Sequence, residues 1–260
     1  MIENICNIAH EAGEVILKHY QKAGEVDHKD DDSPLTQADK DAHEVIKQRL
    51  EEGYPYIPIL SEEGKETPYS EREDWDKFWL VDPLDGTKEF IKGSGEFTVN
   101  IALVRGNQPV LGVIACPGKG FCYYAEIGKG AFYTESTPEK GEPIEVGAPD
   151  TDQPRIVASR DHKGPKVQQL VDHYPNAQLT NSGSSLKFCL VAHGKADVYL
   201  RDVPTMEWDT GAAQVIVEEA GGQVLTLDNK PLTYNKSSLQ NPEIITTGKA
   251  PIKWEEVLTD

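Results

Sequence analysis

The sequence predicts an α/β protein whose first half has an α+β layout and whose second half alternates strands with helices. Two segments within the first 50 residues carry apolar residues at helical spacing. Residues 97–135 alternate apolar and polar positions between Gly-rich turns, which is typical of an antiparallel meander. After about residue 150, short strand patterns alternate with helical ones, as in α/β units. We therefore expect one domain over residues 1–150 and a second over residues 151–260.

The first half is expected to contain two helices followed by strands. Residues 2–20 carry the first helical stripe, and the acidic, Gly-containing stretch 22–34 then indicates an exposed, mobile loop. Thr36 is expected to cap a second helix, with Asp39 at its third position. Two short strands, each running into an acidic segment, are expected at 57–60 and 78–81.

In the second half, strands are expected to alternate with helices along the chain. Its strands are expected at 155–160, 177–183, 196–201 and 223–227. Its helices are expected at 166–174, 184–194 and 207–222.

The composition argues against several classes of protein. The formal net charge of −18 disfavours a nucleic-acid polymer as partner, because such polyanions are held by Lys and Arg. A small anion bound by metal ions or by a few local cations is compatible with it. The four cysteines are scattered without metal-ligand spacing, so we expect neither a zinc site nor a disulfide framework. Because no apolar run could span a bilayer and no secretory signal is present, we expect a cytoplasmic protein.

Acidic residues follow apolar elements at three points of the chain. Glu62 and Glu63 follow one strand, Asp82 and Asp85 follow the next, and Asp209 stands where a long helix is expected to begin. Taken alone, each has a structural explanation: a solvated charge, a turn or a helix N-cap. Three such loops held by rigid apolar elements are better explained by hard divalent cations such as Mg²⁺, which prefer carboxylate oxygens. Two such ions can clamp both the attacking water and the leaving oxygen of a phosphoryl group.

The residues after Asp85 suit a bound phosphate. Gly86 lets the backbone approach closely, and the amides of Gly86 and Thr87 can donate to phosphate oxygens. The Thr87 hydroxyl could orient a water, and Asp39 is the candidate to polarise that hydroxyl. The chain reads D-x-x-D-G-T in mid-sequence, which disfavours the D-x-D-G-T signature of haloacid-dehalogenase-type phosphatases.

These motifs resemble those of the lithium-sensitive, Mg²⁺-dependent phosphatases of the inositol monophosphatase superfamily. The pattern consists of SEEG (61–64), DPLDGT (82–87) and EWDTGAA…EEAGG (207–222), and the likeness extends to about residue 248. Within the superfamily, residues 85–104 and 183–201 are most similar to the CysQ-type 3'(2'),5'-bisphosphate nucleotidases. The resemblance implies a layered αβαβα sandwich with the metal site between its two units. It also implies hydrolysis of adenosine 3',5'-bisphosphate (PAP) to AMP and phosphate, and often of the sulfated form PAPS.

The resemblance further implies roles for individual residues. Two or three Mg²⁺ ions would be held by the side chains of Glu62, Asp82, Asp85 and Asp209 and by the carbonyl of Leu84. The expected catalytic residues are Asp39, Thr87 and Glu62, with Asp39 and Thr87 activating the water. The substrate would be contacted by Gly86, Thr87, His162, Ser184, Lys187, Arg201 and Asp209.

Two of these substrate contacts also follow from charge, because a second phosphate needs cations and this acidic chain has few near its motifs. Lys187 could instead be a surface charge and Arg201 a structural ion pair.

An inositol or sugar phosphatase and a non-catalytic nucleotide or metal sensor remain alternatives. The resemblance also implies inhibition by Li⁺. We expect a small nucleotide as substrate and no obligate protein partner. Some bacterial relatives are assigned to the cytoplasmic face of the inner membrane, but this sequence encodes no anchor.

Overall fold

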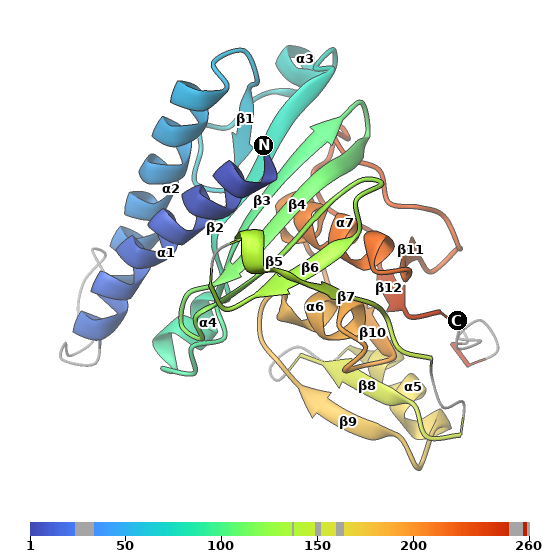
Figure 1. Cartoon of the computed structure of the whole chain (residues 1–260). Coiled ribbons are helices and arrows are strands. Elements are labelled where there is room, and N and C mark those ends of the chain that lie inside the picture. The colour runs from blue at the N-terminus through green and yellow to red at the C-terminus, as the bar shows by residue number, and fades with distance from the viewer. Residues whose placement is uncertain (24–33, 137, 149–151, 160–163, 250–256, 259–260) are drawn as a thin grey trace.

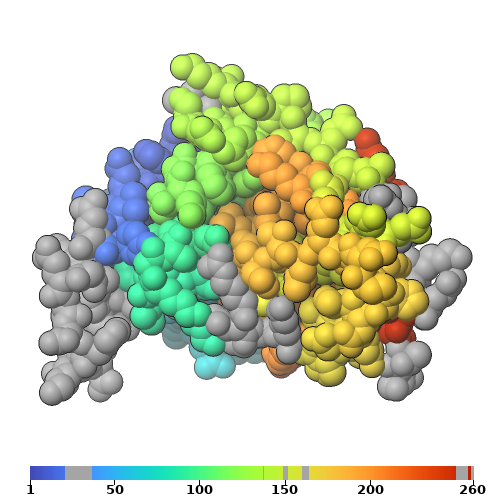
Figure 2. All heavy atoms as spheres, turned by 90° about the horizontal axis from the view of Figure 1, so that it is seen from below, coloured from blue at the N-terminus to red at the C-terminus, as the bar shows by residue number. Residues whose placement is uncertain are grey.

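The helices and strands stack in five layers: a helix pair, a sheet, a second helix pair, a second sheet and an outer helix (Figure 1). This computed structural model describes residues 1–23, 34–136, 138–148, 152–159, 164–249 and 257–258. The layering is the αβαβα sandwich that the resemblance implies, so the fold class is confirmed. Figure 2 shows the face on which green and teal segments of the first half meet yellow and orange segments of the second.

The first layer consists of α1 (Ile2–Ala23) and α2 (Pro34–Gly53), which pack side by side on one face of the first sheet. α2 begins at Pro34, so Thr36 lies inside the helix and the expectation that it caps the helix is wrong. Proline is accepted in the first helical turn because its missing N–H would have no intrahelical partner there. Most of the loop expected over 22–34 lies outside the described residues.

The first sheet has seven strands in the order β1-β2-β3-β4-β5-β6-β7. Its only parallel pair among the described strands is β1 with β2, and the antiparallel meander expected over residues 97–135 is confirmed as β3 to β6. The strands are β1 (Ile59–Ser61), β2 (Lys77–Asp85), β3 (Thr98–Arg105), β4 (Gln108–Cys116), β5 (Phe121–Glu126), β6 (Ala131–Thr134) and β7 (Glu142–Ile144).

Helices cover both faces of this sheet, so its central strands are apolar on both sides. On β2, Trp79 and Val81 pack beneath α1 and α2, whereas Phe78 and Leu80 join the core on the opposite face. That second core lies against α6 (Leu186–Ala192) and α7 (Gly211–Glu219). A Cβ on Gly112 of β4 would lie 2.3 Å from the Ala212 carbonyl oxygen, so only glycine permits this approach of α7.

The second sheet has the order β11-β12-β10-β8-β9, with β10, β8 and β9 parallel and β12 antiparallel to both of its neighbours. Its strands are β8 (Arg155–Ala158), β9 (Gln178–Asn181), β10 (Val198–Arg201), β11 (Gln223–Thr226) and β12 (Ile244–Thr247). Helix α5 (Pro165–His173) packs on its outer face. The proposed division of the chain near residue 150 stays a prediction, because residues 149–151 are not described and α7 contacts strands of both sheets.

Several short elements depart from expectation. The helix expected over 184–194 begins only at Leu186, because Ser184 has a left-handed backbone with φ 47°. The helix expected over 207–222 is split into the 3₁₀ turn η2 (Glu207–Asp209) and α7. Five further elements have no counterpart among those expected from the sequence: α3 (Tyr69–Arg72), α4 (Thr87–Ile91), the 3₁₀ turn η1 (Pro138–Lys140), β7 and β12. Among the described residues, we find no helix with the length and apolar character needed to cross a membrane.

Candidate active site

The end of β2 is shaped by a break in its pairing with β3. The strand register shifts between Asp82 and Asp85, around Pro83, which has no N–H to donate to a ladder. The Leu84 amide donates to Asp82 Oδ1 over 3.0 Å, so the carboxylate folds back on its own turn. Gly86 follows with φ 93°, and a Cβ there would meet the Glu96 carbonyl oxygen and the Ser184 Cβ at 3.1 Å. The turn therefore requires glycine at this position.

Three carboxylates from separate parts of the chain converge beside this turn. Glu62 follows β1, Asp82 lies on the parallel neighbour β2, and Asp209 lies in η2. One carboxylate oxygen from each of these residues lies within 4.8 Å of the others. Burial, then the charge of Asp85, raises the pKa of Asp82 well above its usual range and that of Asp209 to about 7. The same two causes raise the pKa of Glu62.

The cluster fits a divalent cation in two respects. All three ligands offer hard oxygen atoms, which Mg²⁺ prefers. Their charges are also poorly compensated, since burial and neighbouring carboxylates raise the pKa values of all three acids, and the charge of Arg201 offsets only part of this at Asp209. A bound cation would remove that repulsion, so the donor set suits the ion that the motifs imply.

Asp85 is held differently from the other three acids. Its Oδ2 accepts hydrogen bonds from the Ser185 amide (2.6 Å) and from Ser185 Oγ (2.8 Å). Ser185 Oγ also lies 3.0 Å from the Asp209 carbonyl oxygen and accepts from Asn100 Nδ2. This serine therefore connects β2, β3, α6 and η2 next to the acids. Asp85 is outside the 4.8 Å group, and the role expected for the neighbouring Leu84 carbonyl stays a prediction.

Asp39 and Thr87 lie on helices that touch each other. Asp39 is on α2, and α2 packs against α4, whose first residue is Thr87. Asp39 Oδ1 is buried and has no hydrogen-bond partner in the described part of the chain. Burial, followed by the charges of Glu63 and Glu62, raises the pKa of Asp39 to about 8. Asp39 therefore belongs electrostatically to the acidic cluster, whereas Thr87 is exposed and lines the adjoining cleft.

A cleft of about 190 Å³ opens beside the acids, between the start of α4 and the second half of the chain. Lys187 and Arg201 line it together with Ser184 and Tyr199. The Lys187 ammonium is buried, donates to the Ser184 carbonyl over 2.5 Å, and lies 5.5 Å from the centre of the Tyr199 ring. Burial lowers the pKa of Lys187 to about 8. Lys187 is thus a cleft residue and not a charge on the helix surface.

Arg201 also has spare donor capacity toward the cleft. Its Nη2 donates weakly to the Pro204 carbonyl over 3.4 Å, and its Nε is buried with no acceptor among the described residues. No ion pair of Arg201 is found within the described ranges, so the structural ion pair considered for it is not observed there. His162 lies outside the described residues, and its expected contact stays a prediction.

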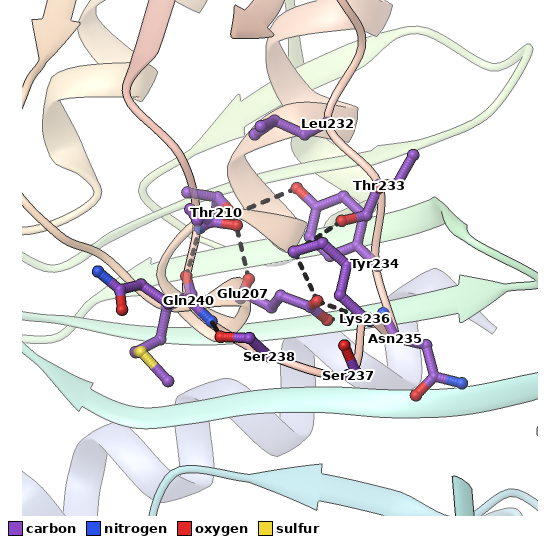
Figure 3. Close-up of polar contacts among 12 residues, drawn as sticks. Glu207, Thr210, Leu232, Thr233, Tyr234, Asn235, Lys236, Ser237, Ser238 and Gln240 are labelled. Carbon is purple, nitrogen blue, oxygen red and sulfur yellow. Dashed lines mark hydrogen bonds and ion pairs between the residues drawn. The ribbon is translucent and has the colours of Figure 1, made fainter. Parts of the chain in front are cut away.

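Sequence reasoning missed a hydrogen-bond network around Glu207 and Thr210, the residues that flank the segment of Asp209 (Figure 3). Glu207 is fully buried and accepts from the amides of Asn235 and Lys236 and from Lys236 Nζ over 2.6 Å. The Tyr234 hydroxyl lies 3.2 Å from Oγ1 of Thr210, the residue that follows Asp209. Asp209 Oδ2 itself accepts from the Met206 amide over 2.8 Å. The sequence contains one sign of this network, because Glu207 stands two residues before Asp209 in the EWD motif. Its partners Asn235 and Lys236 lie almost 30 residues further along the chain, so the motif alone does not reveal them.

Comparisons with known proteins agree with this geometry. A model of the inositol monophosphatase family matches residues 1–256. Over 245 residues the chain is 43% identical to the 3'(2'),5'-bisphosphate nucleotidase CysQ of Salmonella typhimurium, covering 93% of this chain and 97% of that protein. The protein of the same name from Escherichia coli strain K12 is 42% identical over the same coverage.

Solved structures give the same result. The crystal structure of CysQ from Bacteroides thetaiotaomicron matches with a TM-score of 0.86 and 42% identity, covering 96% of this chain and 97% of that one. The extragenic suppressor protein suhB from Bartonella henselae matches with a TM-score of 0.77 and 25% identity, covering 98% and 97%. Since the family model spans nearly the whole chain and these relatives are covered almost completely, the chain belongs to the inositol monophosphatase family.

Proposed function

We propose that this protein is a Mg²⁺-dependent phosphomonoesterase that hydrolyses PAP to AMP and phosphate. The observation that carries the proposal is the convergence of Glu62, Asp82 and Asp209 beside a cleft that also contains Lys187 and Arg201. The relatives named as 3'(2'),5'-bisphosphate nucleotidases support a nucleotide with two phosphates as the substrate. PAPS carries the same 3'-phosphate and is included as a second substrate.

In this proposal, the acids hold two or three Mg²⁺ ions. The ligands are the side chains of Glu62, Asp82, Asp85 and Asp209 and the carbonyl of Leu84. When bound, Mg²⁺ supplies stabilisation of charge on the phosphoryl oxygens and lowers the pKa of a bound water. We also expect inhibition by Li⁺, as in the lithium-sensitive phosphatases that the motifs resemble.

The residues of the chain position the reactants. The amides of Gly86 and Thr87 donate to the oxygens of the phosphate that is removed, at a turn that only glycine allows. The Thr87 hydroxyl orients the attacking water. Asp39, with an unpartnered oxygen and a raised pKa, receives the proton through Thr87. The water then attacks in line with the leaving ribose oxygen, while the acidic cluster keeps the ions in place.

The second phosphate binds at the cationic end of the cleft. Lys187 and Arg201 face the cleft, and each has donor capacity that the protein itself leaves unused or weakly used. Ser184, in its left-handed conformation, presents its backbone and side chain between the two ends. The role of His162 in contacting the nucleotide is part of the same proposal.

A substrate panel tests the proposal directly. Phosphate release is measured from PAP, PAPS, inositol 1-phosphate and fructose 1,6-bisphosphate, with Mg²⁺, without metal, and with Mg²⁺ plus Li⁺. We expect PAP to give the highest kcat/KM, no release without metal, and inhibition by Li⁺. A higher kcat/KM for inositol 1-phosphate or for the sugar bisphosphate would instead make the protein an inositol or sugar phosphatase. No metal-dependent release from any substrate would leave the sensor as the remaining explanation.

Charge reversal in the cleft separates a nucleotide pocket from a general phosphate site. Lys187→Glu or Arg201→Glu should lower kcat/KM for PAP far more than for inositol 1-phosphate, because only PAP carries the second phosphate. Glu66→Gln, an exposed acid after β1, serves as a charge-change control that should behave like the wild type. Equal losses on both substrates would contradict the assignment of Lys187 and Arg201 to the second phosphate.

A further inference from the structure

Glu89 is a buried acid that lines the substrate cleft and has no side-chain partner among the described residues. Its side chain lies on α4, two residues after Thr87, and is only 8% exposed. In the part of the chain that the structure describes, no hydrogen bond or ion pair reaches the Glu89 carboxylate. The Glu89 oxygens are open to the cleft and are not fully enclosed. A carboxylate that faces a substrate cleft without a protein partner is available to a hydrogen-bond donor on the substrate.

The surrounding backbone makes room for this carboxylate. A Cβ on Gly183 would lie 2.3 Å from Glu89 Cγ and 2.8 Å from Glu89 Oε1. The carboxylate therefore rests against the Cα of Gly183, at the wall of the cleft that leads to Ser184. Glu96, a half-buried acid near this wall, differs from Glu89 because its Oε2 accepts a hydrogen bond from the Gly183 amide over 3.1 Å. Glu96 thus has a structural partner, whereas Glu89 does not.

Glu89 is near both of the groups assigned to anion binding in the cleft. Gly86 and Thr87, assigned above to the cleaved phosphate, precede it on the same short segment. Lys187, assigned to the second phosphate, is close enough for the negative charge of Glu89 to act on its ammonium. A carboxylate next to two phosphates repels them, and a hydrogen-bond donor on the substrate would offset that cost. The phosphates offer none, so the donor must come from the group that joins them.

We propose that Glu89 accepts a hydrogen bond from the ribose hydroxyl adjacent to the phosphate that is cleaved, and so selects ribonucleotide over deoxyribonucleotide bisphosphates. The inference rests on the proposed function. In PAP, the 2'-hydroxyl is the donor next to the 3'-phosphate, and Glu89 is only two residues from Thr87. Carboxylates that bind the 2'-hydroxyl of a ribose are an established solution in nucleotide sites. The amino group of the base lies beyond the sugar, farther from the cleaved phosphate.

The test compares PAP with 2'-deoxyadenosine 3',5'-bisphosphate under identical Mg²⁺ concentrations. The wild type should prefer PAP in kcat/KM by about 10- to 100-fold, the value of one hydrogen bond to a charged group. In Glu89→Ala the ratio should fall to about 1. Glu89→Gln keeps the shape and an acceptor oxygen but loses the charge, so its ratio should lie between the two. This conservative variant keeps the test available if alanine at the buried position prevents folding.

Glu96→Gln is the matched control. It removes a charge from the same wall but changes a contact to the Gly183 amide, so it should change both rates by the same factor and leave the ratio intact. A role for Glu89 as a counter-ion of Lys187 alone would likewise lower both rates equally. The inference is overturned if the wild type shows no preference for PAP, or if both Glu89 variants keep the wild-type ratio. Absence of PAP hydrolysis by the wild type would instead overturn the proposed function, and the inference with it.

Discussion

At the scale of single residues, the site depends on acids that the protein keeps at a cost. Asp82 is buried, and this burial is the largest cause of its raised pKa. The charges of neighbouring acids raise the pKa further, with Asp85 acting most strongly. Such a group is expected where a cation or a proton completes the arrangement. Lys187 is the opposite case, a buried ammonium whose pKa is lowered to about 8 in a cleft assigned to an anion.

The acids make the first prediction. Asp209→Asn keeps the shape of the side chain but loses one of the converging charges, and Asp85→Ala removes the acid that acts most strongly on it. Each should lower Mg²⁺-dependent kcat on PAP by on the order of 1,000-fold, because several kcal/mol of charge stabilisation are lost. Circular dichroism should show a folded protein in both cases. Wild-type rates in a folded variant would contradict the metal assignment.

Lys187 makes the second prediction, on the pH dependence of binding. Because its pKa is lowered to about 8, its positive charge is present below pH 8 and is lost as the pH rises through that value. We expect the KM for PAP to rise between pH 7.5 and 9.5. In Lys187→Arg the charge persists over this range, so the rise should disappear. The KM for inositol 1-phosphate provides the control and should show no difference between the two proteins; an identical PAP profile in both would refute the role of Lys187.

At the scale of elements, the position of Asp209 is determined by segments that pack around η2. The segment 233–236 anchors Glu207, and Ser185 at the start of α6 contacts both Asp85 and the Asp209 carbonyl. These contacts join parts of the chain 24 to 100 residues apart. A metal ligand in a short 3₁₀ turn depends on such support, because the turn alone has little rigidity.

This support makes the third prediction. Lys236→Met leaves the fully buried Glu207 without its cationic partner and should lower the free energy of unfolding by about 3 kcal/mol. Because Glu207 is two residues from Asp209, the variant should also bind Mg²⁺ more weakly, which titration calorimetry on the folded protein measures. Lys249→Met breaks an exposed pair with Glu145 and should change neither the melting temperature nor the affinity for Mg²⁺. Unchanged affinity in Lys236→Met would show that the network is structural only.

At the scale of the whole molecule, the acidic cluster lies where the two halves meet, and its protonation is coupled to folding. Asp39 and Asp209 have pKa values of about 8 and about 7 in the folded chain, against about 3.9 for an unperturbed Asp. A group whose pKa is higher in the folded state binds more protons there than in the unfolded state. Its contribution to stability is therefore fully present below about pH 4 and is lost as the pH rises through 7 to 8.

The fourth prediction follows from that sign. With a chelator present, the part of the stability that depends on these acids should decrease from pH 5 to pH 8.5, and Mg²⁺ should restore it with release of protons. The difference in melting temperature with and without Mg²⁺ should therefore grow with pH. In Asp209→Asn this growth should be smaller, because one titrating group is gone. A difference that is constant over pH would contradict the coupling.

Many helices and strands of each half and the motif residues were predictable because they rest on short-range patterns, whereas the layered arrangement was implied only by the resemblance. Alternation over residues 97–135 predicted β3 to β6, and the helical stripe over 2–20 predicted α1, since burial of one face imposes these periods locally. The stretch DPLDGT indicated a tight turn with a glycine, and Gly86 has the positive φ that such a turn needs. The acids Glu62, Asp82, Asp85 and Asp209 were named from their places at the ends of apolar elements.

The convergence of those acids was decided only by the tertiary structure. Their separation within 4.8 Å depends on β1 pairing in parallel with β2 and on α7 packing across the first sheet at Gly112. The same holds for the burial of Lys187, the unpartnered carboxylate of Glu89 and the support of Asp209 by Glu207. Local sequence determines the conformation a segment prefers and which of its faces is apolar. Which distant segments meet, and hence which charges share a site, is settled by packing of the complete chain.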